Sequence, residues 1–192
     1  MARLRTFIAV DPGPAIRDRL VALQQTLARA GSDVKWVERE NLHVTLLFLG
    51  EVTDTDVPAV CDVVAEQTAK LTGFTLSVEN AGCFPHARRP RIVWAGLGQG
   101  AQEVCSLHEA LESPLLELGC YRREERKYTP HITLGRVRSE RSTDSLAAAL
   151  ARHAAWNAGD VAVREVHVLS SELTPQGPIY TVLSRAKLGA GE

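Results

Sequence analysis

Two histidines in this chain stand in nearly the same local sequence. HVTL begins at His43, and HITL begins at His131. Each histidine is followed two places later by a threonine, which is Thr45 in the first motif and Thr133 in the second. Alternate residues of a strand point to the same face, roughly 6.6–6.8 Å apart. Each motif would therefore present an imidazole and a hydroxyl together, with apolar side chains on the opposite face.

A pair of imidazoles with two hydroxyls suits the transfer of a phosphoryl group. Histidine titrates near pH 6.5, so one ring can accept a proton while the other donates one at neutral pH. The hydroxyls and a nearby cation can hold the phosphate oxygens as negative charge shifts. In-line attack needs the base and the acid on opposite sides of phosphorus, so we expect the two motifs to face each other. A lone histidine of this kind would more often be structural, and the repetition favours a site.

Other chemistries find less support in the sequence. A zinc site uses three or four ligands, but neither motif has a second histidine or an acid two or four residues away on its own face. The serines lack the G-x-S-x-G pattern of a nucleophile elbow, and GLGQG lacks the lysine of a phosphate-binding loop. The remaining histidines share no pattern; they are His86, His108, His153 and His167. The sequence therefore predicts neither a metal nor another cofactor.

The composition is that of one soluble globular domain. The chain has 192 residues, of which 45% are hydrophobic and 23% charged, and a net charge of −1. That charge gives no global field for a long nucleic-acid duplex. The first residues lack the apolar core of a signal peptide, and no run approaches the roughly 20 apolar residues of a membrane span. The four cysteines form no C-x-x-C pair. We expect a cytoplasmic monomer with reduced thiols and no membrane contact.

Hydrophobic periodicity divides the chain into short strands and four helices. The helices are expected at 14–30, 54–73, 102–118 and 142–153. The strands are expected at 5–10, 34–38, 41–50, 74–84, 91–98, 131–138, 161–173 and 178–188. Strands that are adjacent in the chain favour antiparallel pairing, so the predicted class is α+β. The motifs lie 88 residues apart, which suggests two pseudo-equivalent lobes of one domain over 1–192, with a core at 3–187 and a frayed tail at 188–192.

Four stretches together resemble a known family. TFIAVDP, NLHVTLLFLGEV, PRIVWAGL and YTPHITLGRVR are similar to the two-histidine phosphoesterase superfamily, and within it to the LigT-like RNA 2′,3′-cyclic phosphodiesterases once named 2′-5′ RNA ligases. The likeness runs from about residue 3 to 187. It implies two pseudo-symmetric lobes of mainly antiparallel sheet, with helices outside and a central cleft. It also implies metal-independent hydrolysis of RNA 2′,3′-cyclic phosphate ends, or of cyclic nucleotides, to 2′-phosphates.

The resemblance also implies roles for the motif residues. His43 would donate a proton to the leaving 3′ oxygen, and His131 would accept one from water. Thr45 and Thr133 would hold the non-bridging phosphate oxygens. Arg136, three places after the second threonine, falls where the family has an arginine that neutralises phosphate. The division into acid and base rests on the resemblance alone, because the two motifs are symmetric in this respect.

Substrate contacts outside the motifs are less sharply indicated. Phe48, Phe84 or Tyr128 could stack on a base, although a place in the core is as good a reading for each. By strict alternation Phe48 falls on the apolar face unless a bulge resets the strand. Trp36 and Trp94 are expected in the core. Two basic clusters could steer an RNA end or could be ordinary surface charge; they comprise Arg88, Arg89 and Arg91, and Arg122, Arg123, Arg126 and Lys127.

Two other functions remain open from the sequence. The same histidines could run the reverse chemistry as a 2′-5′ RNA ligase. Alternatively, the chain could be a non-catalytic module that grips a nucleotide or an RNA end. A binding module would tolerate the loss of one histidine, so the presence of both favours an enzyme.

Overall fold

A computed structural model describes residues 2–123, 127–139 and 142–190. Its strands are β1 (Arg3–Val10), β2 (Val34–Trp36), β3 (Val44–Thr53), β4 (Phe74–Phe84), β5 (Ile92–Leu97), β6 (Ile132–Val137), β7 (Asn157–Val163), β8 (Glu165–Thr174) and β9 (Gly177–Lys187). Its helices are α1 (Gly13–Ala28), α2 (Val57–Ala69), α3 (Ala101–Glu117) and α4 (Thr143–Arg152), with a short 3-10 turn, η1 (Arg39–Asn41).

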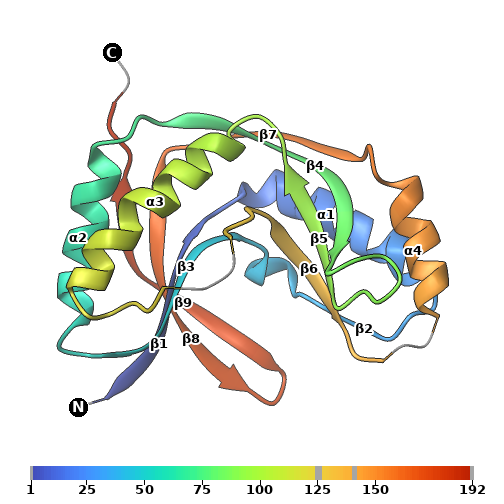
Figure 1. Cartoon of the computed structure of the whole chain (residues 1–192), viewed down its shortest axis with the longest axis horizontal. Helices are drawn as coiled ribbons and strands as arrows, with labels where there is room; N and C mark the ends of the chain where they lie inside the picture. Colours follow the sequence, from blue (N-terminus) through green and yellow to red (C-terminus); the bar gives the residue numbers. More distant parts are fainter. Residues whose placement is uncertain (1, 124–126, 140–141, 191–192) are drawn as a thin grey trace.

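All nine strands belong to one antiparallel sheet whose centre is the junction of the two motif strands. The order is β7-β4-β5-β6-β3-β1-β8-β9, with β2 added to β6. Helices α2 and α3 pack on the half that contains β3, β8 and β9, and α1 and α4 pack on the other half (Figure 1). The predicted α+β class and its two lobes are therefore confirmed.

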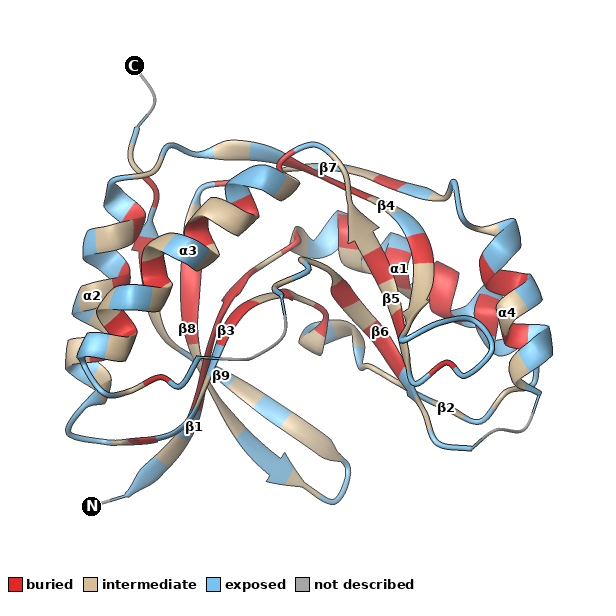
Figure 2. Cartoon of the chain, viewed as in Figure 1, coloured by how far each residue is buried: buried red, intermediate tan, exposed pale blue. Residues whose placement is uncertain are grey.

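The first helix shows how the sequence builds these layers. Ile16, Leu20, Leu23 and Leu27 recur at helical spacing and are all buried. Burying each such side chain contributes about 1.5–3 kcal/mol, so this stripe directs α1 onto the sheet. Buried residues also form one side of α2 and of α3, which Figure 2 shows beside the strands of their half. Among the residues that the structure describes, no helix is both long and apolar enough to cross a membrane.

One predicted strand is in fact two strands in different lobes. The pattern over 161–173 predicts a single strand, but the segment breaks at Arg164. Before the break β7 pairs with β4, and after it β8 pairs with β1. The apolar alternation changes parity here, from Val161 and Val163 to Val166 and Val168. A strand with one continuous buried face would keep its parity, so this change marks the crossing between lobes.

The predicted frayed tail is wrong for its first two residues. The Leu188 N–H donates to the Arg164 carbonyl (2.9 Å), and the Gly189 N–H donates to the Leu71 carbonyl (2.8 Å). Gly189 also forms a bridge with Thr72. Leu188 is buried, so its side chain and the backbone bonds hold this end of the chain. Residues 191–192 lie outside the described residues.

Candidate active site

The two motifs meet at the centre of the sheet. β3 and β6 are joined at one antiparallel pair, Val44 opposite Ile132. Extended by one residue in each direction, this register sets His43 beside Thr133 and Thr45 beside His131. Each histidine stands immediately before its strand. The predicted convergence of the two motifs is therefore present, and it follows from approximate two-fold symmetry about the Val44–Ile132 pair.

Both imidazoles are anchored through the same ring nitrogen. His43 Nδ1 lies 2.7 Å from the Asn41 carbonyl, and His131 Nδ1 lies 2.7 Å from the Thr129 carbonyl. A carbonyl only accepts, so each Nδ1 carries a proton and donates it. The Nε2 atoms are then left for acid–base chemistry. His43 Nε2 lies 2.9 Å from Thr45 Oγ1, so the first motif forms a contact between its own two functional groups.

Aromatic rings pack against both imidazoles at similar distances and at different angles. The Phe7 and His43 ring centres lie 5.0 Å apart, and those of Phe84 and His131 lie 5.1 Å apart. Tyr180 adds an edge contact to His43 at 5.5 Å. Both histidines are half-buried. Each ring is thus fixed by a carbonyl at one nitrogen and by packing on its face, while part of it stays accessible.

The surroundings of both histidines favour their neutral forms. Burial lowers the pKa of His43 to about 4, with a further lowering by Arg17 and an opposing effect of the Asn41 carbonyl. Burial and Arg136 lower the pKa of His131, against the Thr129 carbonyl. In the free chain neither ring is therefore favoured as the protonated partner at neutral pH. A bound phosphate would raise both pKa values through its negative charge.

A one-residue bulge follows each motif and reverses the alternation of its strand. On β3, Thr45 lies opposite Ala9 and Leu47 opposite Ile8, so Leu46 has no counterpart on β1, a strand described in full. On β6, Leu134 is the extra residue, because Thr133 pairs with Trp94 and Gly135 with Val93. These bulges turn the third residue after each threonine to the face of that threonine.

The residues turned to this face are Arg136 in one lobe and Phe48 in the other. Burial lowers the pKa of His131 and raises that of Tyr180, and the Arg136 charge adds a lowering effect on the pKa of each, which places this charge near both rings. The Phe48 side chain is 51% exposed, and its ring centre lies 5.8 Å from that of Phe7. The expectation from strict alternation, that Phe48 faces the apolar side, is wrong because of the bulge.

The other aromatic candidates divide into two groups. Phe84 lies against His131, and its ring is also 5.3 Å from that of Trp94. Trp94, expected in the core, pairs with Thr133 and so shares its face. Tyr128 lies differently, because its ring stacks on His108 and its hydroxyl donates to the Thr45 carbonyl. Of the three aromatic candidates, Phe48 and Phe84 therefore present their rings beside the motif side chains.

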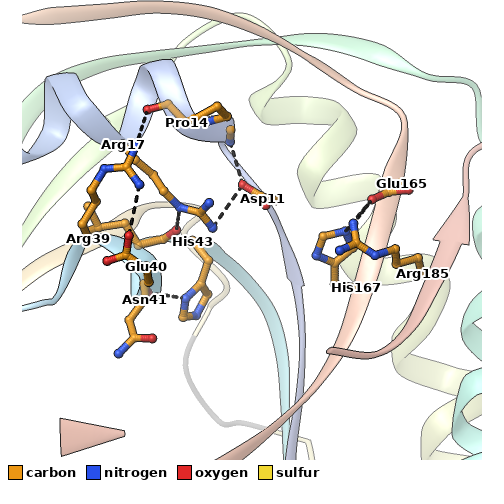
Figure 3. A network of polar contacts seen from close by, with 12 residues as sticks. Asp11, Pro14, Arg17, Arg39, Glu40, Asn41, His43, Glu165, His167 and Arg185 are labelled. Atoms are coloured by element: carbon orange, nitrogen blue, oxygen red, sulfur yellow. Dashed lines mark hydrogen bonds and ion pairs between the residues drawn. The ribbon is translucent and has the colours of Figure 1, made fainter. Parts of the chain in front are cut away.

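A cavity of about 150 Å³ lies beside His43, and most of its charged residues were not found from the sequence. Arg17 reaches it from α1 and pairs with Asp11 at 3.2 Å. On the other side, Glu165 contacts His167 at 2.7 Å and Arg185 at 2.9 Å (Figure 3). Arg17 lies on α1, Arg185 lies on β9, and Glu165 and His167 lie two residues apart on β8, so three elements contribute to this group. The one sequence signal was His167 within an apolar strand.

The two basic clusters lie on the surface. Arg88, Arg89 and Arg91 are exposed in the loop that follows Phe84, and this loop therefore begins beside His131. Arg122 and Arg123 are also exposed, and Arg123 pairs with Glu112 at 3.1 Å. Arg126 lies outside the described residues. The first cluster is thus better placed than the second to meet a ligand of the motif histidines.

The described residues form neither a metal-binding cluster nor a disulfide. Across the described ranges, no group of three or more histidine, cysteine or acidic side chains could hold a metal ion. All four cysteines are free thiols. Burial raises the pKa of each thiol, which keeps them in the less reactive protonated form.

Comparisons with known proteins agree with this geometry. The family model of the 2′-5′ RNA ligase superfamily matches residues 12–175. An RNA 2′,3′-cyclic phosphodiesterase of Methanothermobacter thermautotrophicus is 38% identical over 93% of this chain and 96% of its own. A crystal structure of the Thermus thermophilus protein TT0787 aligns with a TM-score of 0.81, at 27% identity over 98% of this chain and all of the other. Escherichia coli LigT complexed with 3′-AMP aligns with a TM-score of 0.78, at 30% identity over 97% and 99% of the two chains.

Proposed function

The chain belongs to the 2′-5′ RNA ligase superfamily and is an RNA 2′,3′-cyclic phosphodiesterase, and we propose that His43 and His131 are its catalytic acid and base. The observation that carries this proposal is the Val44–Ile132 register, which brings two imidazoles to one junction. Each ring has its Nδ1 atom fixed on a carbonyl and its Nε2 atom left for proton transfer. A general acid and base typically contribute about 10²–10⁴-fold each.

In the proposed reaction, phosphorus sits between the two Nε2 atoms. His131 takes a proton from water as the water oxygen bonds to phosphorus. The bond from phosphorus to O3′ breaks, and His43 gives its proton to O3′. The products are a 2′-phosphate and a free 3′-hydroxyl. His131 then loses its proton to solvent and His43 regains one, so no divalent cation is needed for the balance.

The phosphate oxygens are proposed to be held by Thr45, Thr133 and Arg136. The threonine hydroxyls lie on the same face as the histidines and can donate to the non-bridging oxygens. Arg136 shares that face because of the bulge at Leu134. Its charge offsets that of the bound phosphate, and hydrogen bonds from a charged donor are about twice as strong as neutral ones.

In-line geometry also determines where the nucleoside lies. O3′ must face His43, so the ribose belongs on the His43 side, where the cavity lined by Arg17, Tyr180 and Arg185 is found. The exposed ring of Phe48 is one stacking surface for the base of this nucleoside, whereas Phe84 lies against His131, on the opposite side of the phosphate. We therefore propose that the substrate is an RNA end, or a cyclic nucleotide, with its sugar in this cavity.

Incubation of the protein with a nucleoside 2′,3′-cyclic phosphate in EDTA tests the proposal. The expected product is the nucleoside 2′-phosphate, identified by chromatography against both isomers. A 3′-phosphate would contradict the assignment of His43 to O3′, and activity only after addition of a divalent cation would contradict the metal-free mechanism. Binding without turnover would point to a module that grips RNA ends. The appearance of 2′-5′ linkages from an added 5′-hydroxyl RNA would show the reverse reaction.

We further propose that the enzyme acts as a cytoplasmic monomer. All proposed catalytic groups come from a single chain, so a second copy is not required to complete the site. The four free thiols suit a reducing compartment. Light scattering of the purified protein tests whether it is a monomer, and a mass of two chains would contradict this.

A further inference from the structure

Two backbone carbonyls of the first motif strand are held by a stacked pair of rings. The Tyr128 hydroxyl donates to the Thr45 carbonyl at 2.7 Å, and His108 Nδ1 donates to the Leu46 carbonyl at 2.9 Å. The two rings lie parallel, with their centres 4.0 Å apart and their planes at 2°. His108 comes from α3 and Tyr128 from the segment before β6. Two side chains from distant parts of the chain thus act on consecutive carbonyls.

These carbonyls lie where the strand is irregular. Leu46 is the extra residue of the β3 bulge and is buried. On its other side, β3 is paired with β6 at Val44 alone. A bulge interrupts the ladder of a strand, and a buried carbonyl without a donor is costly. The side chains of His108 and Tyr128 therefore donate to these two carbonyls at the point where the pairing of β3 with its neighbours is interrupted.

The bulge matters for the site because of what it orients. It lies between Thr45, whose hydroxyl contacts His43 Nε2 at 2.9 Å, and Phe48, which it turns to the same face. A regular strand would direct Phe48 into the core side. The hydrogen bonds to the carbonyls of Thr45 and Leu46 therefore help to fix the orientation of the Thr45 and Phe48 side chains.

Tyr128 also belongs to the second motif segment. It precedes His131 by three residues, and the next residue, Thr129, is the one whose carbonyl anchors His131 Nδ1. The Tyr128 hydroxyl therefore ties the segment that orients one histidine to the strand that follows the other, across 83 residues of sequence. Burial raises the pKa of the Tyr128 phenol, so it remains a donor throughout the neutral range.

We propose that His108 and Tyr128 are positioning residues that hold the β3 bulge and the spacing of the two motifs across the site. This inference rests on the proposed function, because it assigns the pair to the geometry of that reaction. Neither residue touches the substrate. Tyr128, expected from the sequence as a stacking residue for a base, is thereby given a different role.

Three variants separate the two hydrogen bonds from the stacking. Tyr128→Phe keeps the ring and removes the hydroxyl. His108→Leu removes both the ring and the donor, whereas His108→Asn restores an amide N–H near the position of Nδ1. His153→Leu is the matched control, because His153 Nδ1 also lies on a carbonyl, that of Ala149 at 2.8 Å, within α4. All four proteins are compared with the wild type by thermal unfolding before assay.

The expected result is a fall of about tenfold in kcat for Tyr128→Phe and His108→Leu, with KM changed less than about threefold. His108→Asn should recover most of the loss, and His153→Leu should match the wild type. An independent readout is the NMR titration of the His43 ring, whose pKa should shift in Tyr128→Phe as its contact with Thr45 loosens.

Two outcomes would overturn the inference. One is an unchanged kcat with an unchanged His43 titration in Tyr128→Phe and His108→Leu, whatever their stability. The other is an equal loss in His108→Asn and His108→Leu, because the donor would then be irrelevant. If the wild type does not cleave cyclic phosphates, the proposed function fails instead. In that case the His43 titration in Tyr128→Phe still decides whether the pair holds the motif.

Discussion

Arg136 and Phe48 occupy equivalent positions in the two lobes, each three residues after a motif threonine and each turned to the site by a one-residue bulge. Equivalent backbone positions in the two lobes thus carry two different side chains. One is a cation suited to phosphate, and the other is an exposed ring suited to a base. In the proposed mechanism the site is therefore symmetric in its acid–base groups and asymmetric in its binding groups, so a substrate would bind in a single orientation.

This asymmetry predicts different kinetic effects for the two side chains. Arg136→Gln should lower kcat/KM by about 10²-fold, mostly through kcat, because the charge on phosphate builds in the transition state. Phe48→Leu should raise KM by about three- to tenfold with little change in kcat, since stacking is made equally before and during reaction. Arg88→Gln, in the exposed loop after Phe84, is the control. Similar small effects at Arg136 and Arg88 would show that the neutralising role is misplaced.

Asparagine substitutions test each histidine without removing its anchor. In His43→Asn and His131→Asn, the side-chain amide can still donate to the carbonyl that held Nδ1, but nothing replaces Nε2. Each variant should lose about 10²–10⁴-fold in kcat, and the double variant should lose little more than the worse single one. His153→Asn, with a similar carbonyl contact, should be unaffected. Steady-state assays with a cyclic nucleotide suffice, and a variant that keeps half of the activity would remove its residue from the mechanism.

The low pKa values predict an acidic optimum for kcat/KM. This parameter reports the protonation of the free enzyme, in which burial places the pKa of His43 at about 4 and that of His131 below its usual value. A bell-shaped pH profile that is bounded by these two pKa values has its maximum below pH 6.5, whichever ring is the acid. The optimum of kcat should lie higher, because bound phosphate raises both pKa values. A kcat/KM maximum above pH 7 would contradict the neutral, buried state of the two rings.

The low pKa of His43 should also make the free energy of unfolding depend on pH. Because the folded pKa of His43 lies near 4 and the unfolded value near 6.5, the unfolded chain binds more protons between these limits. The contribution of His43 to the free energy of unfolding should therefore be constant above about pH 7 and fall by up to about 3 kcal/mol as the pH drops to 4. Urea unfolding at several pH values measures this, and His131 contributes with the same sign. In His43→Asn the fall should be clearly smaller; an identical pH dependence would show that His43 does not titrate in this way.

The sequence predicted the parts of the site that depend on local pattern. The repeated His-x-Thr spacing and the short apolar strands were enough for both motifs and for the α+β class. The face of Phe48 and the break at Arg164 were not predicted, because a bulge or a change of lobe depends on which strand lies alongside. The contacts of Tyr128 were missed for a related reason: its partners are a carbonyl 83 residues earlier and a ring on α3.

The cavity beside His43 offers the sharpest test of where the nucleoside lies. Val182 lines this cavity, whereas Ile179, three residues earlier on the same strand and also exposed, does not. Val182→Trp should fill the proposed position of the ribose and raise KM for nucleoside cyclic phosphates by about tenfold or more, equivalent to about 1.4 kcal/mol of binding. Ile179→Trp should leave KM unchanged. Inorganic phosphate, which in the proposed site contacts only the motif side chains and Arg136, should inhibit the wild type and both variants equally. If Val182→Trp instead weakened phosphate inhibition as much as substrate binding, the substitution would have disturbed the phosphate position, and the ribose would have to be placed elsewhere.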